Sequence, residues 1–432
     1  MEETIYQKGL IIGINTYTDI NKDELFNLEI EELKNLSLAC EVEILDCITQ
    51  NRRFCDPNTY LGKGKIDEIK MVIDALDIEV VICNDELEPR QISYLEKELD
   101  IQVFDRTYII LEIFNRRSTT REARLQVEIA RLDYMLPRLV GLHDGLSRQR
   151  GSGGGFARGK GAGETKLELD RRYLTNKIVS LRKELAELTQ LRKEQRRKRQ
   201  KNEEKTVSLV GYTNSGKSST INAIMDNYLV VKKDEKKKVL EKDMLFATLE
   251  TSTRSINLKQ GNKFLLTDTV GFINKLPTSL VEAFKSTLEE VKESDLIIHV
   301  VDASNPNYEE QIQATINTLK ELDALNIPVI YAFNKTDLID NYFFIPQKYY
   351  PSITMSAKNN TNIDCLISLV LDKLYDDYFE AKLNIPYKDS FVLEMIKRNS
   401  INYNIEYNDD NILFNGKINP RIINEIEQYK MD

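Results

Sequence analysis

The stretch TVSLVGYTNSGKSSTINAIM, residues 206–225, is the strongest indication of fold in the sequence. It begins with an apolar run typical of a buried strand, continues into a loop that matches GxxxxGK[ST], and ends in a helical pattern. Backbone amides of such a loop bind phosphates, while Lys217 reaches the outer phosphates and the Ser218 hydroxyl binds Mg²⁺. The stretch therefore predicts a doubly wound α/β nucleotide-binding domain of the P-loop class. The residues expected to contact the nucleotide are Gly211, Tyr212, Thr213, Asn214, Ser215, Gly216, Lys217, Ser218 and Ser219.

A second motif, FLLTDTVGF at residues 264–272, gives a predicted strand that ends beside Asp268. An acid at this position can hold Mg²⁺ through water, and the backbone amide of Gly271 can bond the terminal phosphate. Phe272 comes next, where many switch GTPases carry a glutamine that orients the attacking water. A phenyl ring cannot orient water, so we expect slow intrinsic hydrolysis and no catalytic residue beyond the nucleotide site.

Two more predicted strand ends indicate which base is bound. VIYAFNKTD, residues 329–337, ends in Asp337, whose carboxylate can accept both donors of a guanine edge, which adenine lacks. ITMSAK, residues 353–358, supplies a backbone amide for the guanine carbonyl. Four such motifs in order indicate GTP and GDP as ligands. The expected base-site residues are Asn334, Lys335, Asp337, Ser356, Ala357 and Lys358.

Asn214, inside the phosphate loop, has two interpretations. Its side-chain carbonyl could hold a monovalent cation, K⁺, near the phosphates. Alternatively, the side chain could cap a local turn. The spacing of the motif favours neither interpretation over the other.

Residues 1–116 are predicted to form an α/β domain with a mostly parallel sheet, because short β-rich runs alternate with helical patterns. The nucleotide domain is expected at 205–375. Residues 376–432 are typical of a small α+β domain with a hairpin that turns at Asp409 and Asp410. The expected N-terminal strands are Gly9–Ile14, Glu43–Cys47, Val80–Cys83 and Ile101–Phe104, and the expected helices include Ile30–Cys40 and Lys65–Ala75.

Residues 117–204 are predicted to form a long antiparallel helical hairpin. Its first helix is expected from Thr119 to Val140, ending near Gly141, and its second from about Thr165 to Glu203. The loop between them has seven glycines from Gly151 to Gly163 and cannot fold alone. The second helix carries a narrow apolar heptad seam, typical of a helix that packs on a neighbour. The seam residues are Leu167, Leu174, Ile178, Leu181, Leu185, Leu188 and Leu191.

The net charge is −9, from 60 basic and 69 acidic residues, but the charges are distributed unevenly along the chain. By itself this value argues against a nucleic-acid partner. Residues 141–205, however, hold 18 basic and 9 acidic side chains, a net of +9, so the remainder carries −18. The basic stretch suits a polyanion, and a solvated helix face is the alternative interpretation.

Composition excludes several classes of protein. The 432 residues suffice for about three domains, and 41% hydrophobic with 30% charged residues exclude a collagen-like or wholly disordered chain. No apolar run approaches the roughly 18 residues that cross a bilayer, and the N-terminus lacks the basic start of a signal peptide, so we expect a cytoplasmic protein without membrane insertion. Five scattered cysteines form no zinc-ligand spacing, and we expect reduced, mostly buried thiols.

Over most of its length the sequence resembles the HflX family of ribosome-associated GTPases. The most specific stretches are YLGKGKIDEIK at 60–70, FNRRSTTREARLQVEIARLDYMLPRLVGL at 114–142 and LSRQRGSGGGFARGKGAGETKLELDRR at 146–172. DTVGFINKLPTSLVEAFKSTLEEV at 268–291 is similar to the family's second switch, including the phenylalanine. The resemblance implies a GTPase that binds the large ribosomal subunit, where the glycine-rich loop and hairpin probe the peptidyl-transferase region.

GTP binding in this family promotes separation of stalled or idle ribosomes into subunits. A hairpin of +9 with a basic tip agrees with an rRNA partner, because rRNA supplies phosphates and shaped loops. The residues expected to contact rRNA are Arg148, Arg150, Arg158, Lys160, Arg171 and Arg172.

The first switch departs from the family pattern after LFATLE. The hydroxyl that binds Mg²⁺ falls on Ser252 by alignment or on Thr253 by residue type, and both alternatives stay open. A lysine-rich insertion at 231–243 precedes it, which we interpret as a mobile loop rather than an extra rRNA contact.

The leading interpretation is therefore an enzyme that hydrolyses GTP to GDP and phosphate with Mg²⁺ and splits or recycles ribosomes. The alternative is a GTPase that acts in assembly of the large subunit. A third interpretation is an RNA-binding module in which the nucleotide domain is passive. We expect the free protein to be a monomer.

Overall fold

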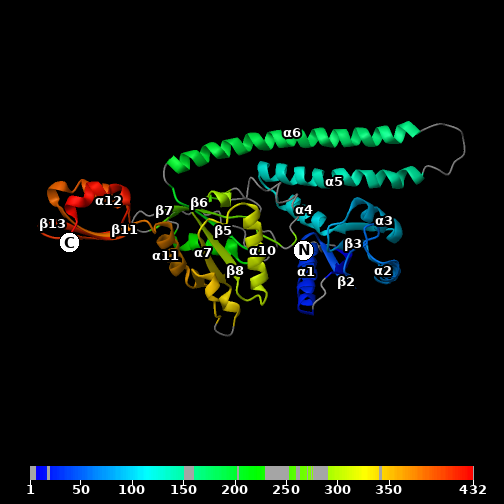
Figure 1. Cartoon of the computed structure of the whole chain (residues 1–432), viewed down its shortest axis with the longest axis horizontal. Helices are drawn as coiled ribbons and strands as arrows, with labels where there is room; N and C mark the ends of the chain where they lie inside the picture. The colour runs from blue at the N-terminus through cyan, green and yellow to red at the C-terminus, as the bar shows by residue number, and fades with distance from the viewer. Residues whose placement is uncertain are drawn as a thin grey trace, which may run out of the picture. The chain divides into compact units, whose positions relative to one another are not determined.

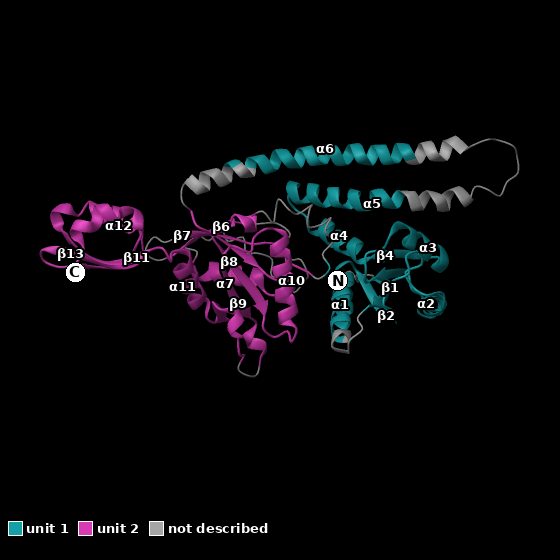
Figure 2. Cartoon of the chain, in the orientation of Figure 1, with its two compact units in different colours: residues 1–194, 243–249, 274–286 teal, residues 195–242, 250–273, 287–432 magenta. Residues whose placement is uncertain are grey.

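A computed structural model of the chain has two compact units, each described by itself (Figure 2). One contains residues 1–194, 243–249 and 274–286, and the other contains 195–242, 250–273 and 287–432. The structure describes residues 6–16, 20–149, 160–201, 204–228, 253–258, 263–269, 271–273, 275, 290–339 and 343–431.

The N-terminal part of the chain forms a four-stranded parallel sheet in the order β2-β1-β3-β4. This confirms the expected α/β fold. The edge strand β2 is longer than the predicted 43–47, because its polar second half, which an apolar pattern cannot reveal, continues to pair with β1 as far as Asn51. The strands are β1 (Gln7–Asn15), β2 (Val42–Asn51), β3 (Val80–Cys83) and β4 (Gln102–Asp105), and the helices are α1 (Ile20–Ala39), α2 (Lys63–Leu76), α3 (Pro89–Leu99) and α4 (Arg106–Arg117).

Two long helices, α5 (Arg121–Gln149) and α6 (Lys160–Lys201), follow and lie side by side (Figure 1). Ion pairs Lys177–Glu128, at 2.6 Å, and Arg121–Glu184, at 2.7 Å, lie seven residues apart on each helix in opposite directions and fix the antiparallel register. The predicted end of the first helix near Gly141 is wrong. A glycine costs a helix only about 1 kcal/mol, too little to end it without another breaking signal.

The heptad seam is confirmed in its middle and wrong at its end. Ile178 is buried, and Leu174, Leu181, Leu185 and Leu188 are half-buried. Leu191 is 58% exposed. Arg121, the first residue of α5, pairs with Glu184 at 2.7 Å, so Leu191 lies about 10 Å beyond the start of the partner helix.

Asp105, at the end of β4, anchors α5 to the N-terminal sheet. Its side chain is fully buried and accepts hydrogen bonds from the Leu87 and Tyr108 amides, at 3.1 and 2.8 Å. It also accepts from the Tyr134 hydroxyl at 2.8 Å and pairs with Arg138 Nη2 at 3.1 Å. Both of these last partners belong to α5, so the hairpin base is held by a buried, fully bonded carboxylate.

The nucleotide unit contains a six-stranded sheet in the order β10-β9-β8-β5-β7-β6. Strand β6 is antiparallel to β7 and the other pairs are parallel, as in a doubly wound fold with a reversed edge strand. The strands are β5 (Thr206–Val210), β6 (Thr253–Asn257), β7 (Lys263–Thr267), β8 (Leu296–Asp302), β9 (Val329–Asn334) and β10 (Ser352–Thr354), and the helices include α7 (Lys217–Tyr228), α10 (Tyr308–Glu321) and α11 (Ile363–Leu374).

The C-terminal residues fold into a three-stranded antiparallel sheet, β11-β13-β12, whose buried face packs Leu383, Ile385 and Phe414 against Ile396. The predicted hairpin is confirmed: β12 and β13 are paired and flank Asp409 and Asp410. The elements are β11 (Phe379–Pro386), α12 (Val392–Arg398), β12 (Ser400–Tyr407), β13 (Asn411–Ile418) and α13 (Ile423–Ile426).

The expectation that the cysteine thiols are mostly buried is wrong for three of the five cysteines. Cys40 and Cys83 are buried, Cys47 is half-buried, and Cys55 and Cys365 are exposed. All five are free thiols, as expected. Among the described helices, none is both long and apolar enough to cross a membrane.

Candidate nucleotide-binding site

The loop between β5 and α7 is built around two glycines that no other residue can replace. Gly211 has φ +150°, and a Cβ there would lie 2.2 Å from the Val300 carbonyl oxygen. Gly216 has φ +92°, and a Cβ there would lie 2.1 Å from Asn334 Nδ2. The close approach of β8 and β9 to the loop therefore requires glycine at both positions.

Lys217, the first residue of α7, is buried beneath this loop. Its Nζ donates to the carbonyl oxygens of Gly211 and Tyr212, at 2.9 and 2.8 Å. Burial lowers the pKa of Lys217 to about 8, although the nearby Asp268 carboxylate acts in the opposite direction. A buried cation at a helix N-terminus is stabilised by an anion, which is the role the phosphates of a nucleotide would take.

The residues expected to hold Mg²⁺ supply suitable oxygen ligands. Ser218 is half-buried in the first turn of α7, and Asp268 is fully buried where β7 ends. A hydroxyl and a carboxylate are ligands that Mg²⁺ prefers. Thr253 lies in β6 with its Oγ1 3.1 Å from Thr267 Oγ1, and Ser252 lies outside the described residues. The choice between these two hydroxyls stays a prediction.

Gly271 and Phe272 lie against the phosphate loop. The Thr213 amide donates to the Phe272 carbonyl oxygen at 2.8 Å, and the Phe272 amide donates to the Gly211 carbonyl oxygen at 3.1 Å. The Phe272 side chain is only 2% exposed. It is therefore part of the core, and it supplies no polar group that could orient a water molecule.

Asn334, at the end of β9, joins the phosphate loop to the segment after β10, residues 355–358, which we call the base loop. Its Nδ2 donates to the Ser215 carbonyl oxygen at 3.0 Å, and its Oδ1 accepts from the Ala357 amide at 2.9 Å. The side chain is 2% exposed. One buried amide thus holds together two segments that the sequence analysis treated as separate contacts.

Asp337, which is predicted to contact the base, is exposed. Its Oδ1 accepts a hydrogen bond from the Ser356 hydroxyl at 2.6 Å, which fixes the carboxylate. The sequence predicts a backbone amide from this segment but does not reveal this contact of the Ser356 hydroxyl. Lys358, also predicted to lie at the base, is exposed two residues further on.

Lys335 has a partner that the sequence analysis missed. It adopts φ +65°, and its Nζ pairs with Asp302 Oδ2 at 2.7 Å. Asp302 is the last residue of β8, and an acid at the end of a buried strand was the available signal. The pair orients the lysine alongside the base loop.

Asn214 is exposed and has φ +60°, a left-handed conformation that asparagine tolerates better than most residues. The Ser215 amide donates to the Tyr212 carbonyl oxygen at 3.2 Å and closes the turn around it. The backbone conformation thus suits asparagine, and whether its side chain caps the turn stays a prediction. A cation ligand needs a free side-chain carbonyl and is compatible with the same backbone.

The predicted rRNA contacts are described only in part. Arg171 and Arg172 are exposed on α6. Arg148 and Lys160 lie within α5 and α6, at the ends that face the connecting loop. Arg150 and Arg158 lie outside the described residues, as do residues 231–243.

Three protein-family profiles match the chain: GTP-binding GTPase N-terminal at 27–115, GTP-binding GTPase middle region at 117–199, and 50S ribosome-binding GTPase at 206–335. The chain is 40% identical over 390 residues to the GTPase HflX of Caldanaerobacter subterraneus subsp. tengcongensis, covering 90% of this chain and 86% of that protein. It is 41% identical over 415 residues to the GTPase HflX of Lacrimispora saccharolytica, and the match covers 96% of this chain and 94% of that protein. It is 36% identical over 362 residues to the GTPase HflX of Escherichia coli, and the match covers 83% of this chain and 82% of that protein.

Proposed function

Because the chain belongs to the HflX family of GTPases, we propose that it binds the large ribosomal subunit and uses GTP to separate stalled or idle ribosomes into subunits. The observation that carries this proposal is the basic hairpin, which is anchored at its base by the buried carboxylate of Asp105. The protein would act in the cytoplasm, where its ribosomal partner is found.

The chain's own residues would bind and orient the phosphates. Loop amides and the Lys217 ammonium would hold the outer phosphates, and the Asp337 carboxylate would select guanine. Mg²⁺ would be held by the Ser218 hydroxyl and, through water, by Asp268. When bound, it neutralises charge on the phosphates.

Turnover by the free protein should be slow, because the buried Phe272 ring leaves no side chain there to orient water. We place a K⁺ ligand at Asn214, where the cation would stabilise developing charge. The large subunit would then supply the group that orients the attacking water, and hydrolysis would follow binding to the ribosome.

The hairpin would reach rRNA. Helix α6 has 42 residues and is therefore about 63 Å long, enough to extend well beyond the N-terminal sheet. Exposed Arg171 and Arg172 would neutralise rRNA phosphates near the far end. Since the base of the hairpin is fixed, displacement at one end would be transmitted along the helix pair.

GTP turnover with and without purified large subunits tests the partner. We expect clear stimulation by large subunits and none by small subunits. Replacing Arg171 and Arg172 together by alanine should weaken binding to large subunits and lower the slope of log affinity against log salt by about 1.4 to 1.8. Replacing Lys388 and Lys397 in the C-terminal domain by alanine removes the same charge and is the matched control.

Shortening residues 151–163 to a short linker tests the splitting activity. Basal GTP hydrolysis should survive, because the phosphate loop is untouched, while separation of subunits should be lost. If the shortened protein splits ribosomes at the wild-type rate, the loop is only a connection between two helices. If neither protein splits ribosomes but both bind large subunits, a role in subunit assembly is favoured.

A further inference from the structure

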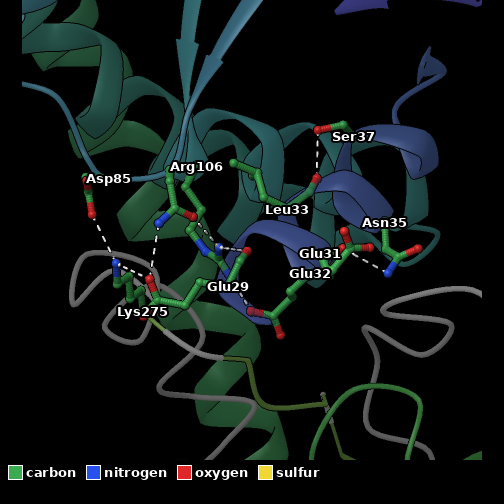
Figure 3. Close-up of polar contacts among 10 residues, drawn as sticks. Glu29, Glu31, Glu32, Leu33, Asn35, Ser37, Asp85, Arg106 and Lys275 are labelled. Carbon is green, nitrogen blue, oxygen red and sulfur yellow. Dashed lines mark hydrogen bonds and ion pairs between the residues drawn. The ribbon is translucent and has the colours of Figure 1, made fainter. Parts of the chain in front are cut away.

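Lys275 follows Phe272 by three residues in sequence but belongs to the compact unit of the N-terminal sheet. Figure 3 shows its side chain between two carboxylates. Its Nζ lies 2.7 Å from Glu29 Oε2, on α1, and 3.0 Å from Asp85 Oδ1, just after β3. The Glu29 side chain is 8% exposed and that of Asp85 is 32% exposed. Lys275, a residue of the second switch, therefore forms ion pairs with the N-terminal α/β unit only a few residues in sequence after Gly271.

The carboxylate of Glu29 is held in place by a buried network. Asn84 Nδ2 donates to Glu29 Oε2 at 3.1 Å, and Arg106 Nη1 donates to Asn84 Oδ1 at 3.1 Å. Arg106 is 2% exposed and also pairs with Glu32 (Figure 3). Because these partners are fixed by one another, Glu29 presents a preorganised acceptor.

Asp85 is fixed in a similar way. Its Oδ2 accepts from the Tyr60 hydroxyl at 2.6 Å, and that hydroxyl in turn accepts from the Ile14 amide at the end of β1. Burial lowers the pKa of Lys275, but the charges of Asp85 and Glu29 raise it above its usual value. The lysine is therefore charged at neutral pH, and both ion pairs are formed.

The segment before Lys275 packs closely on the phosphate loop. Phe272 makes two backbone hydrogen bonds to this loop. Gly271 is also close to it, because a Cβ built on Gly271 would lie only 3.1 Å from Lys217 Nζ. If the terminal phosphate contacts both the Gly271 backbone and the Lys217 ammonium, one of its oxygens must lie between them, about 2.7–2.9 Å from the ammonium. GTP should therefore displace Gly271, whereas GDP, which lacks that phosphate, should not.

We propose that Lys275 couples occupancy of the terminal-phosphate site to the N-terminal α/β unit through its ion pairs with Glu29 and Asp85. Displacement of Gly271 by GTP pulls on Lys275 and weakens these pairs. By thermodynamic reciprocity, the pairs in turn disfavour GTP relative to GDP. This inference rests on GTP binding at the site described above and does not depend on the ribosome.

Nucleotide affinities of full-length variants test the coupling. Replacing Lys275 by alanine should tighten a non-hydrolysable GTP analogue relative to GDP by about fivefold, the low end of typical coupling. Lys275→Arg keeps the charge and should stay close to wild type. Lys70→Ala is the matched control, since Lys70 pairs with Glu98 at 3.2 Å at similar exposure on two other helices. An unchanged ratio in Lys275→Ala, or an equal shift in Lys70→Ala, would overturn the proposal.

Hydrogen exchange provides an independent readout. In wild type, peptides that contain Glu29 and Asp85 should exchange faster with the GTP analogue bound than with GDP. In Lys275→Ala the two nucleotides should give the same exchange in these peptides. Equal exchange in wild type would contradict the coupling even if both nucleotides bind normally, whereas failure of either nucleotide to bind would instead refute the site.

Discussion

Replacing Asn334 by alanine should weaken GTP and GDP together, because this side chain connects the phosphate loop to the base loop. It donates to the Ser215 carbonyl oxygen at 3.0 Å and accepts from the Ala357 amide at 2.9 Å. With 2% of the residue exposed, water does not readily replace these partners. Both nucleotides share the guanine base and the inner phosphates, so the loss should not distinguish them.

The magnitude follows from the two bonds that Asn334→Ala removes. Each neutral hydrogen bond contributes about 0.5–1.5 kcal/mol net, and a buried partner left unsatisfied costs about 1–3 kcal/mol. At about 1–1.5 kcal/mol each, where these two ranges overlap, the two losses cost about 2–3 kcal/mol of the free energy that holds the loops together. Since each 1.4 kcal/mol is a factor of ten, the dissociation constants should rise by about 30-fold to 150-fold.

Fluorescence titration with labelled GDP and a labelled non-hydrolysable GTP analogue measures both constants. Asn399→Ala is the control, because it removes one side-chain hydrogen bond, to the Met395 carbonyl oxygen at 2.9 Å, in the C-terminal domain. Circular dichroism establishes that each variant is folded. A folded Asn334→Ala protein with both constants within twofold of wild type would refute the bridging role.

Three further predictions concern the same site. Asp337→Asn should weaken GTP and admit xanthosine triphosphate, because an amide can no longer accept both guanine donors; retention of wild-type GTP preference in competition binding would show that the base assignment is wrong. K⁺ should stimulate hydrolysis more than Na⁺, and Asn214→Gly, which keeps the left-handed backbone, should abolish the difference in phosphate release; equal wild-type rates in the two salts would contradict this. GTP affinity should fall about tenfold from pH 7 to pH 9, because Lys217, whose pKa burial lowers to about 8, loses its proton and must regain one to bind phosphate. A flat pH profile would show that the buried lysine keeps its charge.

The phosphate loop was predictable because its geometry is encoded locally. Gly211 and Gly216 are required by positive φ angles and by close contacts, and the flanking strand and helix have clear patterns. The bridge through Asn334 was not predictable, because Ser215 lies 119 residues away in sequence. Residue type alone does not report which distant carbonyl an amide contacts.

The hairpin shows the same limit. Helical periodicity in α5 and α6 identified two helices, but Leu191 was assigned to a seam that has no partner there, since α5 begins opposite Glu184. Glycine is common at helix ends, so the sequence predicts an end near Gly141, whereas α5 continues to Gln149. Lys275 gave no signal, because its partner Asp85 is 190 residues away.

Sedimentation of purified ribosomes through sucrose gradients shows whether the protein separates ribosomes into subunits. Monosomes incubated with the protein and a non-hydrolysable GTP analogue should separate into large and small subunits, with the protein on the large subunit. The same incubation with GDP should leave monosomes intact. Intact monosomes with both nucleotides, while the protein still sediments with free large subunits, would contradict ribosome splitting.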